Sequence, residues 1–150
     1  MIKRLQIDNL SDLVPLFDQY MVFYGKESNP SKYEAYLRER IEKNEATVFL
    51  AYDEAGEALG FVLNYFSYSS VSLGKIVVLN DLFVVEGKRG GGIGQVLIER
   101  SFELAREVGA VRVDLGTAKT NKVAQGLYEK IGFVKDTEFF AYSFCLCADA

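Results

Sequence analysis

The sequence contains no histidine and no tryptophan, and it has only two cysteines and two prolines among 150 residues. Without histidine, neither a Ser-His-Asp nor a Cys-His mechanism is available, and every metal site that needs a histidine ligand is excluded. Any general base must be a carboxylate, an amine, a tyrosine or a water. Cys145 and Cys147 are too few for a structural zinc site, which needs about four ligands. We expect no metal and a reduced, cytoplasmic protein.

Long hydrophobic runs are also missing. Lys3, Arg4 and Asp8 interrupt the start of the chain, so no signal peptide is expected. The longest uncharged run, residues 58–74, contains Asn64 and four serines, and it is too short and too polar to span a bilayer. The net charge is −4 and no basic run is present, which disfavours nucleic-acid binding. We therefore expect neither membrane nor nucleic acid as a partner.

What the chain does contain is enough apolar material for one core. Hydrophobic residues make up 49% and charged residues 25% of a length that suits a single domain, residues 1–150. Residues 86–135 carry nine basic and six acidic side chains, whereas the remaining segments are acidic. A basic middle is compatible with a polyanionic cofactor opposite a cationic substrate, and it is equally compatible with chance.

The hydrophobic spacing predicts an α/β fold, with a mixed sheet of six to seven strands flanked by about four helices. Apolar residues three or four apart predict helices that start near residues 10, 33, 93 and 123. The element order is β-α-α-β-β-β-α-β-α-β-β, with expected strands at 2–7, 46–52, 58–66, 75–85, 111–115, 133–135 and 138–147. A turn at 53–57 favours an antiparallel hairpin, and the strand–helix–strand unit 76–115 favours a parallel crossover.

A glycine-rich turn, Glu86–Gly92, joins a buried strand to an amphipathic helix. Backbone N–H groups at the start of a helix lack intrahelical acceptors, and the helix dipole adds positive potential, so this turn is suited to an anion. It lacks the Gly-Lys-Ser/Thr of a P-loop, and its glycines do not have the spacing of the dinucleotide fingerprint. A plain tight turn is the alternative.

Three segments together resemble the GNAT superfamily of N-acetyltransferases. Arg89–Gly94 is similar to the Arg-x-x-Gly-x-Gly loop of that family, and residues 121–133 match the pattern N-x-x-A-x-x-L-Y-x-K-x-G-F. Upstream, Leu79–Val84 resembles the family's fourth strand, and the wording Asn-Asp-Leu-Phe-Val is most similar to the histone/polyamine acetyltransferase subgroup.

The resemblance implies a GNAT-like fold and acetyl-CoA as the acetyl donor. It assigns acetyl-CoA binding to Leu82, Phe83, Val84, Arg89, Gly90, Gly91, Gly92, Ile93, Gly94 and Asn121, and it makes the Tyr128 phenol the general acid for the leaving thiolate. Each role has a plainer alternative. Tyr128 could pack beside Ala124, and Asn121 could only cap a helix.

The general base is where the sequence departs from the polyamine acetyltransferase pattern. Those enzymes often carry a carboxylate where this chain has Asn80, and an amide cannot act as a base. The neighbouring Asp81 is the expected catalytic carboxylate, acting through a water, although adjacent strand residues point to opposite faces unless a bulge intervenes. A purely structural Asp81 is the alternative.

The family resemblance also directs the expectation for the acceptor. Tyr24, Glu27, Tyr65 and Asn80 are the expected substrate-binding residues, because aromatic and acidic side chains suit a cationic amine, although aromatic residues also pack in cores. A small amine such as a polyamine or diamine is the expected acceptor. The alternatives are protein lysines or N-termini, or a non-catalytic acyl-CoA-binding regulatory protein. The apolar tail 139–146 suggests a homodimer interface or an internal strand.

Overall fold

A computed structural model describes residues 1–147 of the chain. These residues form two compact units, Met1–Gly116 and a second unit that begins at Thr117. Among the described residues, no helix is long and apolar enough to cross a membrane. No group of three or more histidine, cysteine, aspartate or glutamate side chains within residues 1–147 is arranged to hold a metal ion.

The first unit is built on a five-stranded mixed sheet with the order β1-β2-β3-β4-β5. Its strands are β1 (Ile2–Arg4), β2 (Ala46–Tyr52), β3 (Ala58–Ser69), β4 (Gly74–Val84) and β5 (Arg112–Asp114). β1 to β4 pair antiparallel, and β5 runs parallel to β4, which confirms the predicted fold class. β3 continues three residues beyond its predicted end because residues 67–69 pair with 74–76 in a tight hairpin.

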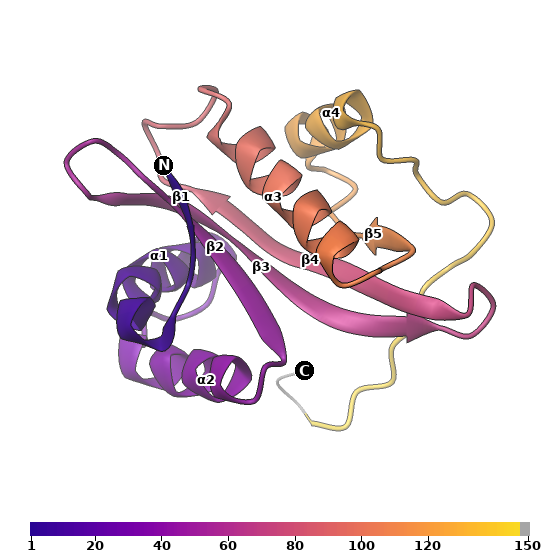
Figure 1. The fold of residues 1–150 in the computed structure, drawn as a ribbon, viewed down its shortest axis with the longest axis horizontal. Coiled ribbons are helices and arrows are strands. Elements are labelled where there is room, and N and C mark those ends of the chain that lie inside the picture. Colours follow the sequence, from indigo (N-terminus) through magenta and orange to yellow (C-terminus); the bar gives the residue numbers. More distant parts are fainter. Residues whose placement is uncertain (148–150) are drawn as a thin grey trace. The chain divides into compact units, whose positions relative to one another are not determined.

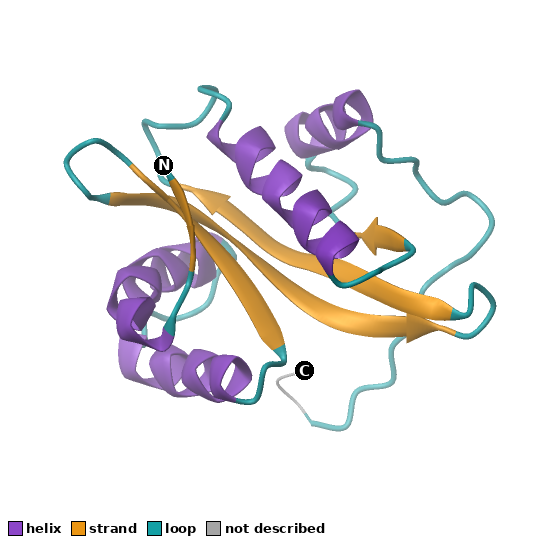
Figure 2. Ribbon diagram, viewed as in Figure 1, coloured by secondary structure: helices purple, strands orange, loops and turns teal. Residues whose placement is uncertain are grey.

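Helices cover both faces of this sheet. α1 (Leu10–Phe23) and α2 (Pro30–Glu42) lie on one face, and α3 (Ile93–Glu107) lies on the other (Figures 1 and 2). Alternate side chains of β2 point to opposite faces of the sheet and pack against the helices on each face. Val48 and Leu50 pack in the core under α1 and α2, whereas the Phe49 ring lies beneath the Arg100 guanidinium of α3 at 4.6 Å. β2 is therefore buried from both sides.

A β-bulge interrupts the pairing of β3 with β4. Leu63 lies opposite Asp81 and Asn64 lies opposite Leu79, so Asn80 is the extra residue of β4. A bulge changes the side-chain alternation that a regular strand imposes on neighbouring residues. This irregularity decides the orientation of the Asn80–Asp81 pair.

The second unit contains α4 (Lys122–Ile131) and an extended tail. The strands predicted at 133–135 and 138–147 are wrong: these residues form no strand, so the described sheet has five strands rather than six or seven. Local hydrogen bonds take the place of strand pairing. The Phe133 N–H donates to the Tyr128 carbonyl at 2.9 Å, and the Asp136 carboxylate accepts from the N–H groups of Glu138 and Phe139 at 2.8 and 3.3 Å.

Candidate active site

A buried carboxylate lies at the bulge of β4. Asp81 is only 8% exposed, and its Oδ1 accepts a hydrogen bond of 2.6 Å from the Tyr20 hydroxyl of α1. Its Oδ2 accepts from the Asn80 side-chain amide at 3.0 Å. The bulge allows these neighbours to meet, although they follow one another in a strand. Asn80 is exposed and Asp81 is buried, so the pair connects the protein interior to the surface.

Burial sets the protonation behaviour of this carboxylate. The low polarity around Asp81 raises its pKa above the ordinary value, because the charged form loses its hydration. The hydrogen bonds from Asn80 and Tyr20 act in the opposite direction, since they favour the charged form. The net shift is upward, which makes Asp81 a stronger base than an exposed aspartate while two donors keep its oxygens in place.

Aromatic rings surround the Tyr20–Asp81 hydrogen bond. The Tyr20 ring lies 4.9 Å from that of Tyr24, 5.8 Å from Phe61 and 6.1 Å from Phe83, measured between centroids. These rings exclude water from one side of the bond and fix the direction of the phenol. Tyr24, predicted as a substrate-binding residue, is 55% exposed at the end of α1, so it lies at the outer end of this aromatic group.

The glycine-rich turn lies at the carboxyl end of β4, directly before α3. Gly90 and Gly92 have φ angles of +83° and +85°, so a side chain at either position would be strained, although no atom lies within 4 Å of the point that a Cβ would occupy. The first α-helical bond of α3 runs from the Val96 N–H to the Gly92 carbonyl at 3.1 Å. The N–H groups of Ile93, Gly94 and Gln95 therefore belong to the helix start that needs outside acceptors.

These features fit a phosphate group. The space beside the glycines is open, the backbone approaches without side chains, and the N–H groups at the start of α3 are suitable donors. The Arg89 side chain is not part of this opening. Its Nε donates to the Val84 carbonyl at 2.8 Å, and its guanidinium lies over the rings of Phe23 and Phe83 at 5.3 and 5.5 Å. Arg89 therefore ties the turn to the aromatic group.

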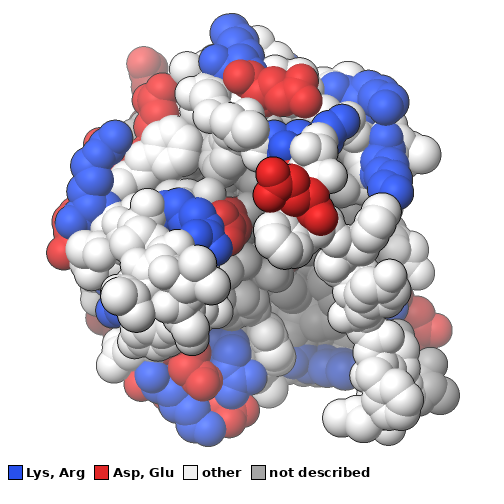
Figure 3. All heavy atoms as spheres, turned by 90° about the vertical axis from the view of Figure 1, so that its right-hand side faces the viewer, with Lys and Arg blue, Asp and Glu red and all other residues white. Residues whose placement is uncertain are grey.

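The positive charge of residues 86–135 is partly neutralised within the segment. Arg100 pairs with Glu103, and the Arg112 Nε lies 3.0 Å from the Asp114 carboxylate. On the face shown in Figure 3, lysine and arginine side chains are interspersed with aspartate and glutamate. The glycine turn, rather than a block of basic side chains, is thus the feature suited to an anion.

The second unit holds two of the predicted residues, Asn121 and Tyr128. The Asn121 Oδ1 accepts from the Ala124 N–H at 3.2 Å, so Asn121 caps α4, as its position predicts. Tyr128 lies in the last turns of the same helix, and its ring meets that of Phe133 edge-on at 5.8 Å. The contact of either residue with acetyl-CoA stays a prediction.

Tyr65 and Glu27 occupy different surroundings. Tyr65 is half-buried on β3, and its hydroxyl shares a 2.7 Å hydrogen bond with that of Tyr36. Burial, followed by this hydrogen bond, raises the pKa of Tyr65 well above its usual range. Glu27 lies in the exposed loop between α1 and α2, where its backbone carbonyl accepts from the Tyr33 hydroxyl. The structure thus brings Tyr65, but not the Glu27 side chain, into a hydrogen-bonded group.

Sequence reasoning missed three residues around Tyr65. Tyr36 and Arg40 lie on α2, and Glu45 is the residue immediately before β2. All three line a cavity of about 1,090 Å³. The signal for two of them was available, because positions 36 and 40 are one helical turn apart and share a face. Glu45 follows the end of α2, where its N–H donates to the Arg40 carbonyl at 2.8 Å, so contacts local in the chain place it beside Arg40.

Comparisons with known proteins agree on one family. Residues 13–133 match the acetyltransferase (GNAT) family. The chain is 38% identical over 141 residues, 94% of each chain, to the uncharacterized N-acetyltransferase YhfO of Bacillus subtilis (strain 168). It is similar to a crystal structure of a probable acetyltransferase, with a TM-score of 0.92, 37% identity and 98% coverage of both chains. A thialysine N-epsilon-acetyltransferase of Bos taurus is 36% identical over 80 residues, 53% of this chain and 46% of the bovine protein.

Proposed function

Because the chain belongs to the acetyltransferase (GNAT) family and is an N-acetyltransferase, we propose that its acceptor is the primary amine of a small molecule such as a diamine or polyamine. The name of the bovine relative specifies the ε-amine of thialysine, which is itself a primary amine of a small molecule. The first unit also contains a cavity large enough for such a ligand.

The observation that carries the proposal is the buried Asp81 at the bulge of β4. An alkyl amine with a pKa of about 10.4 is neutral in only about one molecule in 2,500 at pH 7, which costs about 4.6 kcal/mol. A base that removes the proton recovers part of this cost. Burial raises the pKa of Asp81, and Tyr20 and Asn80 hold its oxygens in place. In this proposal, Asp81 takes the proton through a water.

The residues of the glycine turn would hold the acetyl donor. Acetyl-CoA supplies, when bound, an acetyl group activated as a thioester. The backbone N–H groups of Arg89–Gly94 would bind its pyrophosphate, and the backbone of Leu82, Phe83 and Val84 would pair with the rest of the cofactor, with Asn121 as a further contact. The open space at Gly90 and Gly92 supports the first assignment.

Tyr128 is proposed as the general acid. Its phenol would donate a proton to the leaving sulfur, so that the amine nitrogen forms its bond to the acetyl carbon as the carbon–sulfur bond breaks. No covalent intermediate on the protein is needed, which suits a sequence without histidine.

We also propose that the whole chain works as one cytoplasmic acetyltransferase domain that forms a homodimer. The relative YhfO matches 94% of the chain and is covered to the same extent, which supports a domain of this length. The tail supports the homodimer, because Phe140, Tyr142, Phe144 and Leu146 are each at least 85% exposed. Apolar side chains of this kind favour burial against a partner. Sedimentation velocity checks the assembly, and a monomer at micromolar concentration would contradict it.

The test of the proposed function is turnover of acetyl-CoA with a pooled amine panel, read by mass spectrometry. The panel contains diamines, polyamines, amino acids, aminoglycosides and lysine peptides. We expect an acetylated small amine with the wild type and a loss of at least about 100-fold in Tyr128→Phe. Tyr142→Phe is the matched control, since this exposed phenol is proposed only for the dimer interface and has no role in the reaction. Acetylation of peptides alone would contradict the small-amine acceptor, and binding of acetyl-CoA without any product would favour a regulatory protein.

A further inference from the structure

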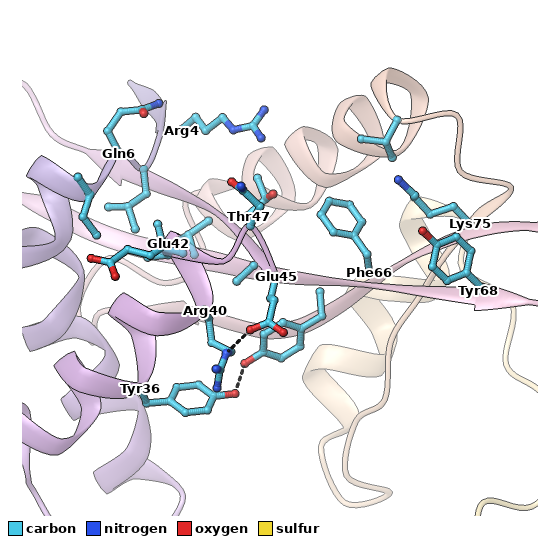
Figure 4. A pocket seen from close by; sticks show the side chains of 18 residues that line it. Arg4, Gln6, Tyr36, Arg40, Glu42, Glu45, Thr47, Phe66, Tyr68 and Lys75 are labelled. Atoms are coloured by element: carbon cyan, nitrogen blue, oxygen red, sulfur yellow. Dashed lines mark hydrogen bonds and ion pairs between the residues drawn. The ribbon is translucent and has the colours of Figure 1, made fainter.

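The large cavity of the first unit is lined by charges of both signs. Figure 4 shows Arg40, Tyr36 and Glu45 gathered on the side of α2, with Phe66, Tyr68 and Lys75 on the far side. The charged residues of its lining are Arg4, Arg40, Lys75, Glu42 and Glu45. Three of these residues are cations and two are acids, but Arg40 is paired with both Glu39 and Glu45, so the wall presents charges of both signs rather than a net positive surface.

Arg40 is held in a fixed position at this cavity. Its Nε donates to the Glu45 carboxylate at 2.9 Å, and an Nη nitrogen lies 3.1 Å from the Glu39 carboxylate. Its guanidinium also lies over the Tyr36 ring at 5.1 Å. Glu39 and the Tyr36 ring contact the guanidinium in addition to Glu45, so Arg40 retains two contacts when Glu45 takes another partner.

Tyr65 links this group to Asp81. Leu63 lies opposite Asp81 in the sheet, and Tyr65 is two residues farther along β3. The side chains of Leu63 and Tyr65 therefore lie on the same face, the one covered by α1 and α2. The Tyr65 hydroxyl bonds to that of Tyr36, beside Arg40. The negative charge of Asp81 contributes to the raised pKa of Tyr65, which places the two groups within electrostatic reach. The cavity and the buried carboxylate are thus neighbours.

We propose that Arg40 and Glu45 bind the carboxylate and the α-ammonium group of an amino acid, whose side-chain amine is then the acetyl acceptor near Asp81. This inference rests on the proposed function and narrows the small amine to one that also carries a carboxylate. The guanidinium is a planar donor that matches a carboxylate. A zwitterion offers each member of the Arg40–Glu45 pair an opposite charge, whereas a dicationic diamine would engage Glu45 and face Arg40.

The test compares lysine with cadaverine, which differ only by the carboxylate. We expect the wild type to acetylate lysine with a kcat/KM at least about tenfold higher than that for cadaverine. Arg40→Gln should lower kcat/KM for lysine by about 10- to 100-fold, mainly through KM, and should leave the value for cadaverine unchanged or raise it, because a like charge is removed. Arg40→Lys should recover part of the loss, because it restores the charge without the planar fork.

Arg38→Gln is the matched control. Arg38 lies on the same helix and pairs with Glu34 and Glu42, but it does not line the cavity. It should leave both substrates unchanged. Preference for cadaverine in the wild type, or an equal loss for both substrates in Arg40→Gln, would overturn this inference while leaving the small-amine acetyltransferase intact. Failure to acetylate any small amine would instead overturn the proposed function and the inference with it.

Discussion

Helix α1 is tied to the sheet by a tyrosine–aspartate hydrogen bond near each of its ends. Near its start, Asp12 accepts from the Tyr52 hydroxyl of β2 at 2.7 Å. Near its end, Tyr20 donates to Asp81 of β4 at 2.6 Å. The two bonds have the same chemistry and nearly the same length, but helix and strand exchange the donor and the acceptor.

Burial raises the pKa of one partner at each of these bonds. At the first bond, burial and the bond to Asp12 raise the pKa of the Tyr52 phenol to about 12, so this phenol stays protonated. At the second bond, burial raises the pKa of the Asp81 carboxyl group. A hydrogen bond alone therefore does not make a catalytic carboxylate. The candidate base Asp81 is distinguished by its burial and by the bulge beside it, whereas the Asp12–Tyr52 bond only holds α1 in place.

The largest expected effect comes from replacing the two acids. Asp81→Asn should lower kcat/KM at pH 7 by at least about 100-fold, because an amide cannot accept the proton of the acceptor amine. Asp12→Asn should leave kcat/KM within about twofold. Steady-state kinetics with the best small amine of the panel measure both. Equal activity of Asp81→Asn and wild type, with an unchanged pH profile, would remove Asp81 from the mechanism.

An intermediate effect is expected from the two phenols. Tyr20→Phe removes a hydrogen bond that favours the ionised form of Asp81, so the pKa of Asp81 should rise further. The acidic limb of the pH profile of kcat/KM should therefore move to higher pH. Tyr52→Phe should leave this limb in place. If both variants shift the limb equally, Tyr20 acts on the fold rather than on Asp81.

The smallest effect concerns stability at high pH. The pKa of Tyr52 is raised in the folded protein, so its stabilising contribution is complete below the ordinary value of 10.0 and is lost as the pH rises through about 12. The difference in unfolding free energy between wild type and Tyr52→Phe, about 1 kcal/mol at pH 8, should shrink across this range. Urea unfolding at several pH values measures it, and a constant difference would contradict the assignment.

Much of the fold could be predicted, because helices and strands inside the first unit follow local hydrophobic spacing. The apolar spacing of α3 and the glycine turn before it could be predicted for the same reason. The tail was not. Its apolar residues have the composition of a strand, but a strand exists only where another backbone pairs with it. In residues 133–147, local N–H groups donate instead to the Asp136 carboxylate and the Tyr128 carbonyl.

The features of the candidate site fall into the same two groups, those predicted from the local sequence and those that the tertiary structure decided. The sequence by itself determined the glycine turn, the cap at Asn121 and the motif around Tyr128, because these depend on residues close together in the chain. Only the tertiary structure decided that a bulge at Asn80 lets it bond to Asp81 and that Tyr20 reaches the same carboxylate from α1. These contacts depend on strand register and helix packing, which no local spacing encodes.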